Sequence, residues 1–301
     1  MAAPQGKGPA VVVRRCSGVA RSALQDEGCW LHDCTPKKSE IKFGSQLQMD
    51  IMFLMSRTHE CVLLAVLVCL LRGLSLHAAP DYTEYARLLE TYVVEDGVRY
   101  AEWYQQVADL ARLEAFVTEL GQADVDALSK DDQKALYLNL YNAAMLRAVF
   151  EHYPLQSVKD IGLLPFSIFK KKFIALGDAR VSLDRLEKGI LLKMYFDPRI
   201  HFAVNCASES CPPLRAEPYR GDRLEAQLEE QTRLFADSHR AARVNQVAHS
   251  VAYSELFKWY ADDFSVQNPA RFLNRFRQSK LPIHYAIDWL DYDWSLNAAS
   301  N

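Results

Sequence analysis

One short stretch of the chain carries most of its potentially reactive side chains. Residues 199–214 contain an arginine, a histidine, an asparagine, two cysteines, two serines and a glutamate, and they follow an apolar segment. Polar groups placed at the end of a buried element often form a site, because the rigid scaffold positions them. We therefore expect catalytic roles for Cys206, His201, Asn142 and Asn205, and binding roles for Arg199, Cys211 and Asn139.

Cys206 and Cys211 are separated by four residues, and this spacing allows three interpretations. In an exported domain two such cysteines commonly form a disulfide, although closing so short a loop would contribute only about 2 kcal/mol. Either cysteine could instead be a thiol nucleophile, and the third interpretation is a redox or metal site. Zinc needs four ligands at characteristic spacings, and His201-x4-Cys206-x4-Cys211 matches none of these. No metal and no cofactor is therefore expected.

The segment Ile200–Cys206 has the pattern of a buried strand. In an extended chain His201 and Asn205 would point to one face and Cys206 to the other, which argues against a direct pairing of His201 with Cys206. A base for a thiol nucleophile would then come from elsewhere in the chain. The candidates are His249 and His284 as the base, with Glu187 or Asp288 to orient the imidazole ring.

A buried helix is predicted from about residue 129 to residue 152. Ser129 lies three residues before Asp132, which resembles a capping box, and Pro154 stops the helix. Nearly every side chain between 135 and 150 is apolar or aromatic, so this helix should be buried on all sides. Asn139 and Asn142 share one face of it, and a buried amide without partners costs about 1–3 kcal/mol. Either both amides hold neighbouring loops, or Asn142 orients a catalytic group or polarises a substrate carbonyl.

The remaining patterns predict a domain of the α+β class. It should have a helix-rich N-terminal half with a buried central helix, packed on a mainly antiparallel sheet from the C-terminal half. Further helices are expected at about 81–90, 101–120 (ended by Gly121), 183–194, 223–238 and 268–278. Strands are expected at 173–176 and 179–183, joined in a hairpin by Gly177-Asp178, and at 283–289.

Composition excludes several classes of protein. The 301 residues are 50% apolar and 24% charged, with a net charge of −3. These values exclude a disordered, collagen-like or coiled-coil chain. A net negative charge gives no positive electrostatic potential that would favour a nucleic-acid partner. Residues 80–301 hold 26 basic and 32 acidic side chains, so this part of the chain is more acidic than the whole.

The first 79 residues have the features of a leader and an export signal. Residues 61–71 are an uncharged apolar run with Arg57 before it and Ala78-Ala79 after it. This order is typical of a signal peptide, and the run is too short to cross a bilayer. We expect a signal peptide at 49–79, preceded at 1–48 by an over-extended start or a disordered leader. Residues 80–301 would be a single domain, periplasmic or secreted, with no transmembrane span beyond the signal peptide.

Four ordered motifs carry a resemblance to a known family. They are LNLYNA (138–143), DPRIHFAVNCASESCP (197–212), LFKWY (256–260) followed by Asp263-Phe264, and YDWSLN (292–297). Together they resemble the domain of unknown function 547 family across about residues 82–297. This family is widespread in bacteria and also occurs in plants, often beside a coiled coil. The resemblance implies that Asn142, Arg199, His201, Asn205, Cys206, Cys211 and Pro212 belong to the family pattern, whereas Lys188 stands where a histidine is expected.

Two functional hypotheses follow. The first is an exported thiol-dependent hydrolase or transferase, similar in layout to papain and transglutaminase, with Cys206 as the nucleophile. The second is a non-catalytic envelope domain with a Cys206–Cys211 disulfide that binds a peptide, a glycan or a partner protein. The aromatic residues of 257–264 and 289–294 are expected in the core, with a carbohydrate or peptide platform as the alternative.

Overall fold

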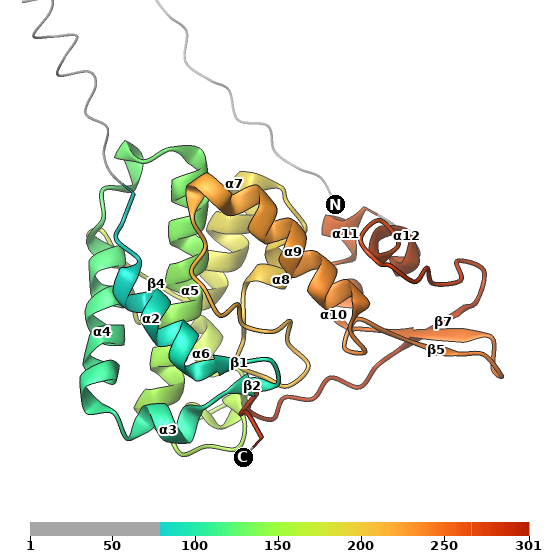
Figure 1. Cartoon of the computed structure of the whole chain (residues 1–301), viewed down its shortest axis with the longest axis horizontal. Coiled ribbons are helices and arrows are strands. Elements are labelled where there is room, and N and C mark those ends of the chain that lie inside the picture. The colour runs from blue at the N-terminus through green and yellow to red at the C-terminus, as the bar shows by residue number, and fades with distance from the viewer. Residues whose placement is uncertain (1–78, 266, 301) are drawn as a thin grey trace, which may run out of the picture. The chain divides into compact units, whose positions relative to one another are not determined.

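The computed structural model describes residues 79–265 and 267–300, so the expected leader and export signal up to residue 78 lie outside the described residues. The described chain is built around helix α5, Lys130–His152. Figure 1 shows α5 between the pair α2 and α4 on one side and α9 on the other. No helix among the described residues is both long and apolar enough to cross a membrane.

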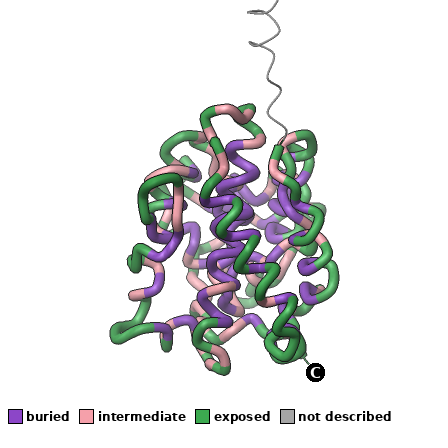
Figure 2. The backbone as a smooth tube through the Cα atoms, turned by 90° about the vertical axis from the view of Figure 1, so that its left-hand side faces the viewer, coloured by how far each residue is buried: buried purple, intermediate pink, exposed green. Residues whose placement is uncertain are grey.

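Helix α5 confirms the predicted buried central helix. It begins where predicted, because the Ser129 hydroxyl accepts a hydrogen bond from the Asp132 backbone N–H at 3.1 Å, and such a cap satisfies a free donor of the first turn. Every residue from Gln133 to Phe150 except Arg147 is buried. Figure 2 shows the buried segments in the interior and the exposed ones on the outer turns.

Three helices of the N-terminal half pack on one side of α5. They are α2 (Thr83–Tyr92), α3 (Tyr100–Tyr104) and α4 (Val107–Gln122), so the helix expected over 101–120 is divided in two. Gly121 lies inside α4 rather than after its end. A Cβ at this position would lie 2.5 Å from the carbonyl oxygen of Ala175, so the glycine permits close packing between α4 and strand β3 instead of ending the helix.

Two short hairpins accompany these helices. Strands β3 (Ile174–Leu176) and β4 (Ala179–Val181) pair antiparallel around Gly177, whose φ of 55° is the left-handed value that such a turn needs, so the predicted hairpin is confirmed. Strands β1 (Val93–Val94) and β2 (Gly97–Val98) form a second hairpin that the sequence pattern does not predict.

Residues 200–203, which lead to the cysteines, are helical although a strand was predicted for Ile200–Cys206. A π-helix, Arg185–Leu191, continues into α7 (Leu192–Tyr195), and α8 (Ile200–Ala203) follows after a turn. The strand prediction for Ile200–Cys206 is wrong because a short apolar run is buried equally well in either conformation. Here Phe202 of α8 packs against Phe235 of α9 (Leu224–Asp237), with ring centroids 4.9 Å apart.

The C-terminal part forms a second, smaller core. Strands β5 (Ala242–Asn245) and β6 (Ser250–Tyr253) pair antiparallel, and β7 (Ala286–Trp289) adds to β6 in parallel. Three short helices cover this core: α10 (Leu256–Trp259), α11 (Ala261–Phe264) and α12 (Pro269–Leu273). The α+β class is confirmed, with sheets of two or three strands among the described residues. Figure 1 shows β5 and β7 extending away from the helices.

The last described residues return to the first core. Backbone hydrogen bonds join Leu296 to Gln156, Asn297 to Ala207, and Ala299 to Val98. The Tyr100 hydroxyl also donates to the Asn297 side chain at 2.8 Å. This segment, residues 292–299, therefore links three parts of the chain. They are α3, the loop after α5, and the loop of residues 204–212 that carries both cysteines, called the cysteine loop below. Short 3-10 turns at Val125–Ala127, Val158–Asp160 and Gly221–Arg223, and helix α6 (Ser167–Lys170), complete the described elements.

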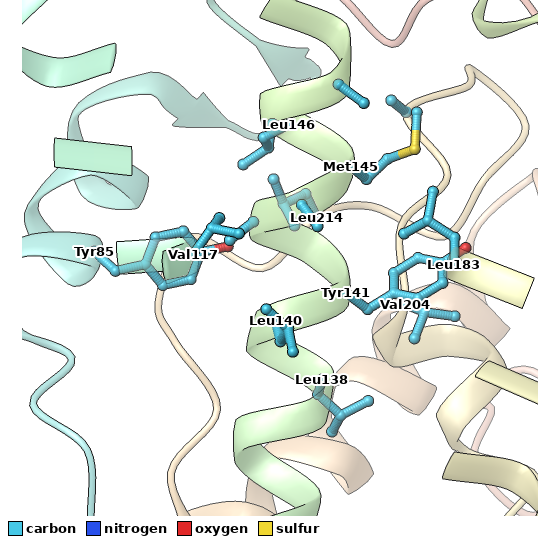
Figure 3. Close-up of a cluster of buried hydrophobic side chains, with 14 of the residues drawn as sticks. Tyr85, Val117, Leu138, Leu140, Tyr141, Met145, Leu146, Leu183, Val204 and Leu214 are labelled. Carbon is cyan, nitrogen blue, oxygen red and sulfur yellow. The ribbon is translucent and has the colours of Figure 1, made fainter. Parts of the chain in front are cut away.

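Stability should depend on the α5 packing that Figure 3 shows, where Leu138, Leu140, Tyr141 and Met145 contact side chains from several other elements. Leu140 is fully buried, so Leu140→Ala should lower the free energy of unfolding by about 2–5 kcal/mol through lost burial and a residual cavity. Urea unfolding followed by circular dichroism measures this. Leu234→Ala is the matched control, because Leu234 is 58% exposed and its truncation should change stability by less than about 0.5 kcal/mol. Equal losses for both variants would contradict this assignment of the core.

Candidate functional site

Two buried asparagines of α5 hold the backbone of distant loops. Asn142 donates through Nδ2 to the carbonyl of Ala203 at 3.0 Å and accepts through Oδ1 from the backbone N–H of Asn205 at 2.8 Å. Asn139 makes the same two-sided contact with Tyr219, at 2.7 Å and 2.9 Å. Each amide thus satisfies a buried donor and a buried acceptor that would otherwise be unpaired. The structure places both asparagines as loop-holding residues, and Asn142 fixes the start of the cysteine loop.

Asn205 closes the cysteine loop from within. Its Nδ2 donates to the carbonyl of Pro212 at 2.8 Å, and its Oδ1 accepts from the backbone N–H of Ala207 at 2.9 Å. Ala207 has a φ of 59°, a left-handed backbone conformation that residues other than glycine adopt at a cost in free energy. The Asn205 side chain holds this turn, and the turn brings Cys206 and Cys211 together.

Cys206 and Cys211 are both free thiols in the structure, and they are neighbours. The backbone N–H of Cys206 donates to Sγ of Cys211 at 2.9 Å. Sγ of Cys206 lies 2.9 Å from the Ser208 hydroxyl and 3.5 Å from the Tyr292 hydroxyl. Cys206 is partly exposed, whereas Cys211 is buried. The two thiols therefore differ both in access to solvent and in hydrogen-bond donors.

These surroundings separate the pKa values of the two thiols. Burial raises the pKa of Cys206, but hydrogen bonds from Cys211, Ser208 and Tyr292 outweigh this effect and lower it to about 7. Burial raises the pKa of Cys211 well above its ordinary value, and its hydrogen bond and proximity to Cys206 raise it further. The loop therefore contains one partly exposed cysteine that is a thiolate in a large fraction of molecules at neutral pH, and one protonated donor beside it.

His201 belongs to a different group of side chains. Its Nε2 lies 2.8 Å from Oδ2 of Asp263, and its ring lies against Tyr260 at a centroid distance of 4.0 Å. Burial lowers the pKa of His201, although the Asp263 carboxylate opposes this shift. Across residues 79–265 and 267–300 no hydrogen bond joins a histidine to either cysteine. His249 and His284, the bases suggested by the sequence, lie instead beside Tyr285.

A buried carboxyl group lies close to the His201 pair. Glu187, presented by the π-helix, accepts hydrogen bonds from the hydroxyls of Tyr260 at 2.8 Å and Tyr141 at 3.4 Å. Burial raises the pKa of Glu187 despite these bonds. Glu187, which the sequence analysis suggested as a group to orient an imidazole, therefore contacts tyrosines. Asp263 is the carboxylate that orients the His201 ring.

Glu187, Tyr260 and Asp263 line a cleft of about 790 Å³. Six aromatic side chains line it, among them Trp259 and Trp294, together with six charged ones. Both indole rings also pack against the ring of Tyr292, at centroid distances of 4.9 Å and 4.5 Å. Because the Tyr292 hydroxyl contacts Cys206, this tyrosine connects the aromatic wall of the cleft with the thiol. A cleft of this size lies within the range of small-molecule sites.

Arg199 is occupied by carboxylates. It contacts Asp197 through Nε at 3.0 Å and Nη2 at 2.9 Å, and Glu225 through Nη1 at 2.6 Å. Lys134 of α5 also bonds to Asp197. Burial raises the pKa of Asp197, but the hydrogen bonds from Arg199 and Lys134 lower it to about 2. The structure thus places Arg199 in an ionic network between α5 and α9, apart from the cysteine loop.

Sequence reasoning identified the loop but missed the groups that surround Cys206. Ser208 and Tyr292 contact its sulfur, and the only sequence signal for Tyr292 is its position in the fourth motif. Among the described residues, no group of three or more histidine, cysteine, aspartate or glutamate side chains is arranged to hold a metal ion.

Comparison with known proteins defines the class of domain. Residues 125–236 match the family model described as "Protein of unknown function, DUF547". The chain therefore contains a DUF547 family domain, as the motifs indicated, and the match covers Asn142, His201 and both cysteines. Asp263 and Tyr292 lie beyond the matched residues. No curated protein and no solved structure matches the chain.

The two asparagines of α5 provide a matched pair of variants. Asn142→Leu and Asn139→Leu each remove two buried hydrogen bonds, so each should lower the free energy of unfolding by about 1–3 kcal/mol. Only Asn142 holds the cysteine loop, so only Asn142→Leu should also change the rate at which iodoacetamide alkylates Cys206. The same alkylation rate in both variants would contradict a positioning role for Asn142.

The pKa assignment predicts the pH profile of alkylation. Cys206 should react with iodoacetamide at a rate that rises with a midpoint near pH 7 and levels off above it, because only the thiolate attacks. Cys211 should stay unreactive across this range. Tyr292→Phe removes one donor to the thiolate, so the midpoint should move to higher pH. Tyr285→Phe, which removes a hydroxyl bonded to Gln246, should leave the profile unchanged. Mass mapping after a short exposure to iodoacetamide at each pH shows which cysteine is modified.

Proposed function

We propose that this domain is a thiol-dependent hydrolase or acyltransferase with Cys206 as the nucleophile. The observation that carries the proposal is a partly exposed thiol whose pKa is lowered to about 7 by neighbouring donors. A thiolate formed in this way needs no histidine to remove its proton. This agrees with the absence of a histidine hydrogen-bonded to either cysteine among the described residues.

The reaction would follow the two steps of acyl transfer. The Cys206 thiolate attacks the carbonyl carbon of an ester, thioester or amide, the bond to the leaving group breaks, and the leaving group takes a proton from solvent. Water or a second nucleophile then attacks the thioester, releases the acyl group and regenerates the thiol. The hydroxyls of Ser208 and Tyr292 lie within 3.5 Å of Sγ, and they would stabilise the oxyanion of each tetrahedral intermediate.

The structure also bears on the alternative of a non-catalytic binding domain. The closeness of Cys206 and Cys211 favours bridging under oxidising conditions, and the predicted export signal would bring the domain into such a compartment. A bridged pair would leave the aromatic cleft as the functional surface, with a peptide, glycan or protein as its ligand. Oxidation state therefore separates the two candidates.

A small activated ester tests the proposed chemistry. The reduced protein should release one equivalent of nitrophenol from p-nitrophenyl acetate in a fast phase and gain one acetyl group on Cys206, detected by mass spectrometry. Cys206→Ala should abolish the fast phase and the adduct. Cys211→Ala removes only the buried thiol that donates to Cys206. This variant should retain the fast phase and the adduct, but the pH at which the rate of the fast phase is half-maximal should be higher.

Two results would contradict the proposal. One is an acetyl adduct whose amount is the same in Cys206→Ala as in the parent protein. The other is a Cys206–Cys211 disulfide in protein purified without reductant that does not reopen at the glutathione potential of its compartment, because a stable bridge leaves no nucleophile.

A further inference from the structure

Several large apolar side chains that line the 790 Å³ cleft are exposed to solvent. Phe196 is 85% exposed, Trp259 is 43% exposed and Phe166 is 37% exposed, and all three line the cleft. Leu163 and Leu164, just before Phe166, are also exposed. Phe257 and Phe264 lie in the core, as the sequence analysis expected, whereas Trp259 of the same segment is exposed in the cleft.

The backbone holds two of these aromatic side chains in a costly conformation. Phe166 has a φ of 65° and Phe196 has a φ of 49°. A left-handed conformation costs a bulky residue roughly 1–2 kcal/mol, and such residues cluster at binding sites. Phe166 precedes α6 and Phe196 follows α7, so two separate elements each place a phenylalanine in the same cleft.

The charged groups of the cleft leave two lysines unpaired. Asp184 pairs with Lys188 at 2.9 Å, and Glu187 accepts hydrogen bonds from tyrosines. Asp263 is hydrogen-bonded to His201, whose lowered pKa leaves this carboxylate as a negative charge in the cleft. Lys170 and Lys193 also line the cleft, and neither has a carboxylate partner within the part of the chain that the structure describes. The cleft therefore offers two unpaired positive charges beside aromatic walls, in a domain that is acidic overall.

We propose that this cleft binds a single-chain anionic amphiphile. Its apolar chain would lie between Phe166, Phe196 and Trp259, and its carboxylate or phosphate would pair with Lys170 and Lys193. The mainly apolar walls favour a hydrocarbon chain over a glycan, which needs more hydrogen-bonding groups along its length. This inference does not depend on the chemistry of Cys206.

Dodecanoate below its micellar concentration is the probe, measured by isothermal titration calorimetry on the protein chain. Dodecanoate should bind at one site, and dodecyltrimethylammonium, with the same chain and opposite charge, should bind at least tenfold more weakly. The double variant Lys170→Gln/Lys193→Gln should lose roughly tenfold or more in affinity. Lys172→Gln is the control for charge, because Lys172 is exposed and does not line the cleft.

Phe196→Ala tests the apolar wall in a side chain that is mostly exposed, so the fold should be retained and dodecanoate should bind several-fold more weakly. Unchanged melting temperatures identify variants that remain folded. Equal affinity for the two detergents, or no effect of the lysine pair, would overturn the proposal. So would binding to phosphatidylglycerol vesicles without any binding of monomeric dodecanoate, because that result would indicate a membrane surface rather than a ligand cleft.

Discussion

The two hydrogen bonds of the Asn142 amide connect the core of this domain to the loop that carries both cysteines. The amide leaves a helix that is buried on all sides and holds the backbone on both sides of Val204. Because α5 cannot shift without disturbing most of the first core, the backbone that Asn142 holds after α8 is also fixed in position. Asn205 then closes the turn, and only in this closed turn do the two cysteines meet. The position of the thiol is thus determined by packing some sixty residues earlier in the sequence.

The structure lowers the pKa of a thiol without the usual means. No helix begins at Cys206, and no imidazolium is bonded to it. Three neutral donors, the Cys211 thiol and the Ser208 and Tyr292 hydroxyls, outweigh the cost of burial. Such donors stabilise the thiolate only when their geometry is fixed. The backbone bonds of the C-terminal segment with Ala207, Glu209 and Ser210 provide this fixation.

The sequence predicted local features well where one physical rule dominates. The Ser129 cap, the buried helix and the Gly177 hairpin each follow from side-chain chemistry over a few residues, and all three are confirmed. The strand predicted at Ile200–Cys206 is wrong, because an apolar run of that length has no periodicity to separate helix from strand. The roles of Asp263 and Tyr292 depend on contacts across 62 and 86 residues, which no local pattern contains. The loop was therefore predictable, and the contacts that lower the pKa of Cys206 were not.

The distance along the chain between Cys206 and Tyr292 has a consequence for the newly made protein. During synthesis both cysteines emerge from the ribosome well before Tyr292, which contacts Cys206 only after residues 292–299 have crossed the cysteine loop. Until that segment docks, Cys206 lacks one of its donors and should keep a pKa closer to the value of about 8.5 of an ordinary thiol. The larger thiolate fraction at neutral pH is therefore acquired only when this C-terminal segment docks, so Cys206 of an unfinished or misfolded chain is a thiolate in fewer molecules.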